Sequence, residues 1–172
     1  MIKEYIRTVP DYPAEGINFY DMNSLFASPV WPYAVESMAK HVASYAQHIT
    51  HIVGIESRGF VVGSAIAQKL GVPFVMVRKS GSKYPGKLLV EEYELEYGID
   101  TLVLQEGLLG HTSRVIIADD LVATGGSMLA TKRLCEKAGA RVLGGVVPIN
   151  LIYLNKDELS DIEIVSLEEV EK

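Results

Sequence analysis

Two adjacent carboxylates, Asp119 and Asp120, stand between an apolar run and a loop of small and hydroxyl residues. The run 115–118 is typical of a buried strand. A helix is expected from Ser127 to Ala138, where apolar residues recur at helical spacing and Gly139 follows as a C-terminal cap. The loop in between contains Ala123, Thr124, Gly125, Gly126 and Ser127.

This order of strand, acids, glycines and helix predicts an anion site. Backbone N–H groups of the loop and of the first helical turn converge on one spot, where the helix dipole favours negative charge. A phosphate bound there would be repelled by Asp119 and Asp120, so these acids are expected to bind another part of the ligand, such as sugar hydroxyls or a bound cation. A phosphorylated sugar satisfies both demands. The alternative is that the two acids only cap the helix.

Cationic residues are expected close to this site. Ser57 and Arg58 follow a predicted strand and precede Gly59, and an arginine can bind two phosphate oxygens at once. A short basic segment farther along contains Arg78, Lys79, Lys83 and Lys87. The alternative for Arg58 is a solvated side chain near a helix cap.

Strands and helices alternate along most of the chain. We expect helices at 31–45, 59–70 and 127–138, and strands at 51–56, 72–78, 115–118, 142–152 and 162–167. Two further runs, 88–97 and 101–105, predict a projecting strand pair around Gly98. This pattern predicts an α/β fold, a mostly parallel sheet flanked by helices, with ligands at the carboxyl ends of the strands. No repeat or linker divides residues 1–172, so one domain is expected.

Composition excludes several classes of function. The net charge of −6 argues against a nucleic-acid surface, and no apolar stretch reaches the roughly 20 residues of a membrane span. The single cysteine, Cys135, suits a reducing compartment and a buried place on its helix, so we expect a cytoplasmic protein. The four histidines form no recognisable metal signature.

The segment 119–128 closely resembles the phosphoribosyl diphosphate (PRPP) loop of the type I phosphoribosyltransferases. It lacks the lysine of a Walker A loop, and the chain has no G-x-G-x-x-G fingerprint. Segments 6–13, 56–60, 77–79 and 92–98 also match in family order, over roughly the first 150 residues. The string Glu-Leu-Glu-Tyr-Gly at 94–98 is the most diagnostic of the adenine phosphoribosyltransferases. Its alternative is an amphipathic edge hairpin.

The resemblance implies a purine-salvage enzyme that converts PRPP and adenine to AMP and diphosphate with Mg²⁺, as a homodimer. It implies a catalytic group at Glu96, Tyr97 and Arg58, with Glu96 and Tyr97 on a projecting hairpin that closes over the site as a flexible lid. It also implies a phosphate loop at Ala123, Thr124, Gly125, Gly126 and Ser127. The resemblance further implies that the ribose is bound by Asp119 and Asp120, and the diphosphate by Ser57, Arg58, Arg78, Lys79 and Lys83. The residues implied to bind the base are Asn18, Phe19, Tyr20 and Leu121. The Mg²⁺ ion is expected to be held mainly by PRPP, near Asp119 and Asp120, with no direct protein ligand assigned.

Four departures from the family pattern are present. Asn18 replaces an apolar residue and Tyr20 replaces an arginine beside the base, the basic loop 79–86 is one residue longer than the usual pattern, and Asn150 stands where the family commonly has glutamate. Asn18 and Tyr20 leave a phosphoribosyltransferase for hypoxanthine, guanine or xanthine open as one alternative. A non-catalytic PRPP-binding regulator is another, although the chain has no added DNA-binding domain and keeps Glu96 and Tyr97.

Overall fold

The computed structural model describes residues 2–81, 83–95 and 98–171. Within them the main sheet has the order β10-β9-β7-β3-β4-β6-β5, and a short β8 pairs with β9. Its strands are β3 (His51–Ile55), β4 (Phe74–Lys79), β5 (Leu88–Leu95), β6 (Gly98–Gln105), β7 (Arg114–Ala118), β8 (Leu121–Val122), β9 (Arg141–Asn150) and β10 (Ile164–Glu169). The strands from β10 to β4 are parallel, and the β5–β6 pair is antiparallel. The predicted α/β fold with a mostly parallel sheet is confirmed.

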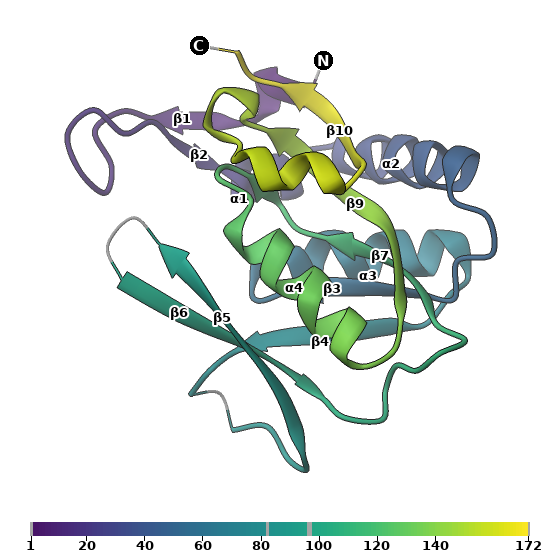
Figure 1. The fold of residues 1–172 in the computed structure, drawn as a ribbon. Coiled ribbons are helices and arrows are strands. Elements are labelled where there is room, and N and C mark those ends of the chain that lie inside the picture. Colours follow the sequence, from purple (N-terminus) through teal and green to yellow (C-terminus); the bar gives the residue numbers. More distant parts are fainter. Residues whose placement is uncertain (1, 82, 96–97, 172) are drawn as a thin grey trace.

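Helices cover both faces of the sheet (Figure 1). The helices α2 (Trp31–Tyr45) and α3 (Arg58–Leu70) lie on one face, and α4 (Gly126–Lys137) lies on the other. Strand β7 shows why, because its side chains alternate between the two layers: Val115 and Ile117 pack on the α4 side, and Ile116 packs on the α2 and α3 side. A parallel sheet buried on both faces requires the nearly continuous apolar runs that the sequence contains.

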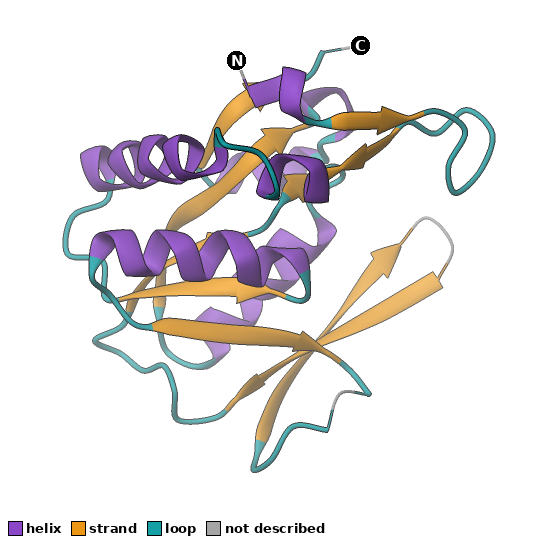
Figure 2. Ribbon diagram, turned by 180° about the vertical axis from the view of Figure 1, so that it is seen from behind, coloured by secondary structure: helices purple, strands orange, loops and turns teal. Residues whose placement is uncertain are grey.

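The N-terminal residues form a small separate layer. Strands β1 (Arg7–Val9) and β2 (Phe19–Asp21) pair antiparallel, between the 3-10 helix η1 (Ile2–Tyr5) and helix α1 (Met22–Phe26). Their apolar residues pack against the carboxyl end of β9. Figure 2 shows this layer beside one end of the sheet, from the opposite side. It therefore stands next to the strand ends where ligands bind in such folds.

One predicted strand begins later than expected. The sequence predicts a strand from Val72, but β4 begins at Phe74. The N–H group of Val72 donates to the carbonyl oxygen of Ala67 at 3.0 Å, and Gly71 lies in the left-handed region, with φ of 69°. These residues therefore close the end of α3, as a glycine C-cap does. Pro73 follows and has no N–H group to give to a neighbouring strand.

The β5–β6 hairpin projects from the sheet as predicted, and its base is fixed to α4 (Figure 1). The Glu91 carboxylate on β5 receives ion pairs from Arg133 and Lys137 of α4, and Lys137 also donates to the carbonyl oxygen of Val90 at 2.9 Å. The Glu91 side chain is 12% exposed, so these contacts are screened less than surface pairs are. Two elements that line the same cavity are thereby held in one position.

Cys135 lies on α4 and is fully buried. Burial raises the pKa of its thiol to about 12, so the group is protonated at neutral pH. The predicted structural role of this cysteine agrees with its position. In the described part of the chain, no helix combines the length and apolar character needed to cross a membrane.

Ile117 tests the two-layer core. It is fully buried on the central strand β7, and replacing it with alanine should lower the free energy of unfolding by about 2–5 kcal/mol, since a cavity remains. Urea denaturation measures this change. Val61 on α3 is 41% exposed and serves as the control, because Val61→Ala should change the same free energy by less than about 0.5 kcal/mol. A loss of less than 1 kcal/mol for Ile117→Ala would contradict the core described above.

Candidate functional site

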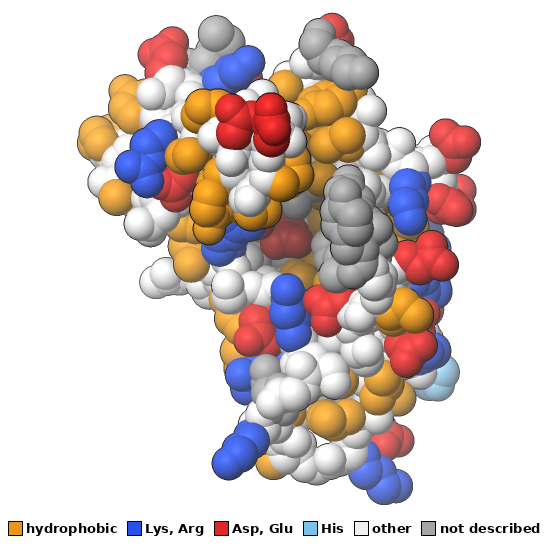
Figure 3. Space-filling view, turned by 90° about the vertical axis from the view of Figure 1, so that its left-hand side faces the viewer, with side chains coloured by type: hydrophobic (Ala, Val, Ile, Leu, Met, Phe, Trp, Pro, Cys, Tyr) orange, Lys and Arg blue, Asp and Glu red, His pale blue; other side chains and the backbone are white. Residues whose placement is uncertain are grey.

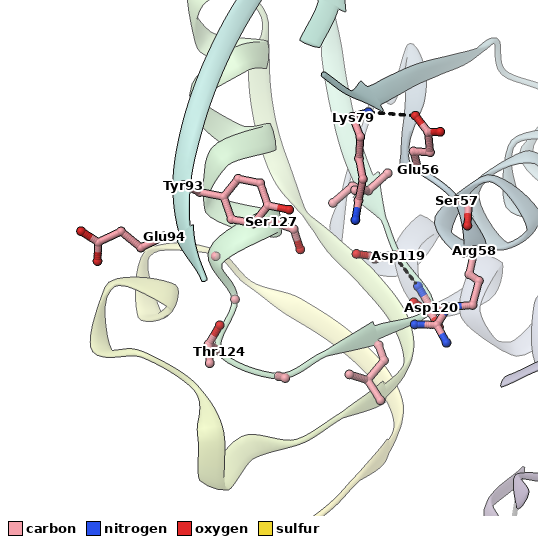
Figure 4. A pocket seen from close by; sticks show the side chains of 15 residues that line it. Glu56, Ser57, Arg58, Lys79, Tyr93, Glu94, Asp119, Asp120, Thr124 and Ser127 are labelled. Atoms are coloured by element: carbon pink, nitrogen blue, oxygen red, sulfur yellow. Dashed lines mark hydrogen bonds and ion pairs between the residues drawn. The ribbon is translucent and has the colours of Figure 1, made fainter. Parts of the chain in front are cut away.

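A cavity of about 400 Å³ opens at the carboxyl ends of β3, β4 and β7. It is visible as a hollow in the molecular surface in Figure 3, and its lining side chains are drawn in Figure 4. The lining residues come from three strand ends, the start of α3, the start of α4 and the hairpin. They are Ile55, Glu56, Ser57, Arg58, Lys79, Tyr93, Glu94, Asp119, Asp120, Leu121, Ala123, Thr124, Gly125, Gly126 and Ser127.

The predicted phosphate loop forms one wall of this cavity, from Ala123 to Ser127. Gly125 precedes α4 with φ of 84°, in the left-handed region, and a Cβ atom there would lie 2.7 Å from Leu159. Both facts require glycine at this position. No side chain caps the first N–H groups of α4, so they remain available to an anion at the positive end of the helix.

The two acids lie at the end of β7, facing the cavity. Asp119 accepts a hydrogen bond from the backbone N–H of Asp120 through Oδ1 at 2.9 Å. The Asp120 side chain is 6% exposed, and its Oδ2 lies 2.9 Å from Nε of Arg58. Burial, followed by the charge of Asp120, raises the pKa of Asp119 well above its usual range. Burial also raises the pKa of Asp120, against the opposing effect of Arg58.

Gly59 has a packing role, because protein atoms fill the space that a side chain at this position would need. A Cβ atom at Gly59 would lie 2.8 Å from the carbonyl oxygen of Ala118 and 3.0 Å from Oδ1 of Asp119. The glycine therefore allows the start of α3 to rest against the end of β7. The peptide bond between Glu56 and Ser57, just before α3, is cis.

Arg58 connects the cavity to the predicted base-binding residues. Its guanidinium lies over the Phe19 ring, 5.6 Å from the ring centroid, while Nε faces Asp120. Of the four predicted base residues, Leu121 lines the cavity and Phe19 adjoins it through Arg58. Asn18 and Tyr20 do not line it. Tyr20 packs in an apolar cluster that includes Leu121, and burial raises the pKa of its hydroxyl.

The basic residues of the 78–87 segment take different positions. Lys79 lines the cavity, and its backbone N–H donates to Oε2 of Glu56 at 2.8 Å. Arg78 turns instead toward Glu56, with Nε 3.4 Å from Oε2, and lies over the Tyr84 ring. Arg78 and Lys83 are not among the residues that line the cavity. One of the three predicted cations of this segment is therefore placed in the site.

Sequence reasoning missed four lining residues: Ile55, Glu56, Tyr93 and Glu94. Glu56 had a signal, because it stands at a strand end directly before Ser57 and Arg58. The position of Tyr93 depends on the register of the hairpin and on contact with Gly126, where a Cβ atom would lie 3.3 Å from the Tyr93 ring. Glu96 and Tyr97, the predicted catalytic pair, lie outside the described residues.

The cavity therefore combines the predicted phosphate loop, a pair of acids of which Asp120 is buried and Asp119 half-buried, and two cations, Arg58 and Lys79. Such a lining suits a ligand with anionic groups at two places and hydroxyl groups between them. The described residues contain no group of three or more His, Cys, Asp or Glu side chains arranged to hold a metal ion.

Comparison with known proteins gives matches over nearly the whole chain. Residues 33–167 match the family model described as phosphoribosyl transferase domain. The adenine phosphoribosyltransferase of Rhodospirillum rubrum is 47% identical over 167 residues, which are 96% of each chain. That of Brachyspira hyodysenteriae is 46% identical and covers 90% of this chain and 89% of its own.

Solved structures agree with these sequence matches. The crystal structure of adenine phosphoribosyltransferase from Thermoanaerobacter pseudethanolicus superimposes with a TM-score of 0.91 at 38% identity, covering 98% of both chains. The Saccharomyces cerevisiae adenine phosphoribosyltransferase, complexed with an imino-altritol bisphosphate and adenine, gives a TM-score of 0.89 at 35% identity. It covers 97% of this chain and 96% of that one.

The raised pKa of Asp119 predicts that this acid makes the free energy of unfolding depend on pH. The usual pKa of an aspartate is 3.8, so the unfolded state loses the Asp119 proton as the pH rises above that value, whereas the folded state keeps it to a higher pH. The contribution of this group to the free energy of unfolding therefore falls as the pH rises from 3.8 to the raised pKa. Asp119→Asn resembles the protonated form. The variant should gain free energy of unfolding over the wild type as pH rises from 4 to 8, by about 1.4 kcal/mol for each unit of raised pKa.

Urea denaturation across this pH range measures the difference between the two proteins. Asp157→Asn, at an exposed acid of the 3-10 helix η3 (Asp157–Asp161), is the control and should show no such trend. A variant that loses stability relative to the wild type as pH rises would contradict the assignment.

Proposed function

The chain belongs to the adenine phosphoribosyltransferases of the phosphoribosyltransferase family, and we propose that its cavity binds PRPP and adenine and releases AMP and diphosphate. The activity is a transfer of a pentosyl phosphate and serves purine salvage. The observation that carries this function is that the phosphate loop at the start of α4 and the acid pair at the end of β7 line one cavity. The chain that contains them is 47% identical to a named enzyme.

We propose that the site binds the substrate in three parts. The 5-phosphate lies on the N–H groups of residues 123–127, where the α4 dipole adds positive potential. The ribose hydroxyls donate to Asp119 and Asp120, which accept hydrogen bonds when ionised. The diphosphate is bound by Ser57, Arg58 and Lys79, from the neighbouring strand ends.

Arg78 and Lys83 are secondary candidates for the diphosphate. The Arg78 guanidinium pairs with Glu56 and lies over Tyr84, so it would have to leave both contacts to reach this cavity. Lys83 stands on the same segment, which follows the end of β4. We propose that they assist only after the segment rearranges, and that Lys79 is the main lysine for the diphosphate.

The residues present fit a Mg²⁺ ion that arrives with PRPP. Mg²⁺ usually keeps several waters and binds through one or two carboxylates plus substrate phosphates, which agrees with two acids and no three-ligand cluster in the described parts. Asp119 and Asp120 would hold it together with ligand oxygens. When bound, the ion neutralises charge on the departing diphosphate.

For the base, we propose a position between Phe19 and Leu121. Apolar faces on both sides suit a flat purine ring, and Leu121 already lines the cavity. The Arg58 guanidinium lies over the Phe19 ring, so a base that stacks there displaces it. Asn18 and Tyr20 flank Phe19 in the sequence, and neither lines the cavity. The complex of the yeast relative with adenine agrees with an adenine pocket in this fold.

In the reaction, N9 of adenine forms a bond to C1 of the ribose while the bond from C1 to the diphosphate oxygen breaks. Arg58 and Lys79 receive the negative charge that develops on the diphosphate. The proton of N9 passes to a base, for which Glu96 is the candidate, with Tyr97 beside it on the hairpin. Closure of the hairpin over the site would exclude water, which otherwise competes as the acceptor.

Two other functions remain to be tested against this one. The residues Asn18 and Tyr20 favour a changed base preference, and parallel reactions with hypoxanthine, guanine and xanthine would reveal it. A PRPP-binding regulator would bind PRPP tightly and turn over none of these bases. The identity of 47% to a named adenine phosphoribosyltransferase, over 96% of the chain, favours the enzyme.

The direct test is AMP formation from adenine, PRPP and Mg²⁺, followed by chromatography. Asp120→Asn should lower kcat/KM for PRPP by about 100-fold or more, because a buried ribose contact and the partner of Arg58 are lost together. Glu96→Gln should lower kcat by about 100-fold, since proton transfer by a placed group contributes 100- to 10,000-fold. Glu36→Gln, which removes a carboxylate paired with Lys40 and Lys69 on α2 and α3, should leave both constants unchanged.

We also propose that this single-domain chain is cytoplasmic and forms a homodimer, in which the segment that follows Arg78 reaches toward the partner's site. Several apolar side chains on the described surface are exposed, including Met76 at 39% on β4. Light scattering should give a mass of about twice the 18.9 kDa of one chain. A monomer at enzyme concentrations that support full activity would contradict the dimer.

A further inference from the structure

A further acid, Asp100, lies on the hairpin and contacts residues that line the cavity. Asp100 of β6 stands directly opposite Tyr93 of β5. Its Oδ2 accepts a hydrogen bond from the Tyr93 hydroxyl at 2.9 Å and lies 3.5 Å from Nζ of Lys79. Its Oδ1 accepts from the backbone N–H of Thr101 at 2.8 Å. Both Tyr93 and Lys79 line the cavity, as Figure 4 shows, whereas Asp100 does not.

These contacts keep Asp100 charged and in place. Its side chain is 25% exposed. Partial burial raises its pKa, but the hydrogen bonds from Thr101 and Tyr93 and the charge of Lys79 outweigh that effect and leave the pKa below its usual value. A full negative charge therefore stands beside the lysine that the site offers to an anion.

We infer that Asp100 competes with the bound diphosphate for the ammonium group of Lys79 and so limits how tightly that product is held. The inference rests on the proposed function, because it assumes that the diphosphate binds at Lys79. An ammonium has three donors and can turn between two acceptors, so Lys79 need not leave its strand to exchange Asp100 for a ligand oxygen.

Two effects of Asp100 on diphosphate binding oppose each other. Holding the Lys79 side chain in place saves some of the entropy of ordering it, which favours binding. The carboxylate also competes with the diphosphate for the ammonium and repels it. Competition should win, because it acts on a ligand with several negative charges, whereas Lys79 is 53% exposed and is only loosely ordered by one contact at 3.5 Å. Removing the charge should therefore tighten diphosphate binding.

The test is isothermal titration of inorganic diphosphate, in magnesium buffer, into the wild type and variants. Asp100→Asn should bind diphosphate about 3- to 10-fold more tightly, in line with the modest strength of partly exposed pairs. Asp100→Glu keeps the charge and should stay within about 2-fold of the wild type. Diphosphate should also inhibit AMP formation by Asp100→Asn more strongly, by a similar factor. A purely structural role for Asp100 would weaken binding instead.

A double-mutant cycle shows whether Asp100 acts through Lys79. Lys79→Met alone should weaken diphosphate binding, and adding Asp100→Asn to it should change affinity by less than about 2-fold. Glu36→Gln is the matched control, because it too removes a carboxylate that lies between two lysines, at 2.9 and 3.8 Å, but away from the cavity.

Several results would overturn the inference. These are weaker or unchanged binding in Asp100→Asn, the same tightening in the Lys79→Met background, and no diphosphate binding by any form. If Asp100→Asn does not fold, Asp100→Leu and Asp100→Ser take its place. Wild-type affinity for diphosphate in Asp100→Leu, or weaker diphosphate binding in Asp100→Ser, would also overturn the inference. Failure of the proposed function looks different, because the wild type would then form no AMP whatever the diphosphate affinities are.

Discussion

Much of the site depends on placing two adjacent carboxylates, one buried and one half-buried, at the end of a buried strand. Asp119 and Asp120 end a strand that is buried on both faces, and the start of α3 closes against them without a side chain at Gly59. Burial is unfavourable for charged groups, and the raised pKa values of both acids record that cost. The ion pair from Arg58 to Asp120 offsets part of it. A ligand that brings hydroxyl groups or a cation would offset more of this cost, and that gain would favour substrate binding.

The elements around this pair of acids place positively charged and hydrogen-bond-donating groups at separate positions. The start of α4 supplies uncapped N–H groups for an anion, while Arg58 and Lys79 supply cations on the opposite side of the acids. Lys79 is itself balanced by Asp100, and Arg78 by Glu56. The site is thus built from paired charges rather than from a positive patch. That arrangement agrees with the overall charge of −6 and with a reaction that must release its anionic product.

Local patterns in the sequence predict much of the fold and one half of the site. The alternation of apolar runs with helical spacing indicates the parallel sheet, and the loop 123–127 lies where its glycines and the following helix predict. Contacts between distant segments are harder to predict. Tyr93 enters the cavity because Glu91 anchors the hairpin to α4, and Arg78 leaves it because Glu56, 22 residues earlier, binds its side chain. Neither pairing leaves a spacing signal in the sequence.

The central claim is that the α4 loop binds the sugar phosphate while the acid pair binds the sugar. Amide chemical shifts of ¹⁵N-labelled protein, titrated with ribose 5-phosphate and separately with inorganic phosphate and ribose, test it most directly. The account predicts large shifts at Thr124, Gly125, Gly126 and Ser127 with ribose 5-phosphate, and further shifts at Asp119 and Asp120 that inorganic phosphate does not cause. Shifts confined to other surfaces, or identical responses to ribose 5-phosphate and phosphate, would contradict it.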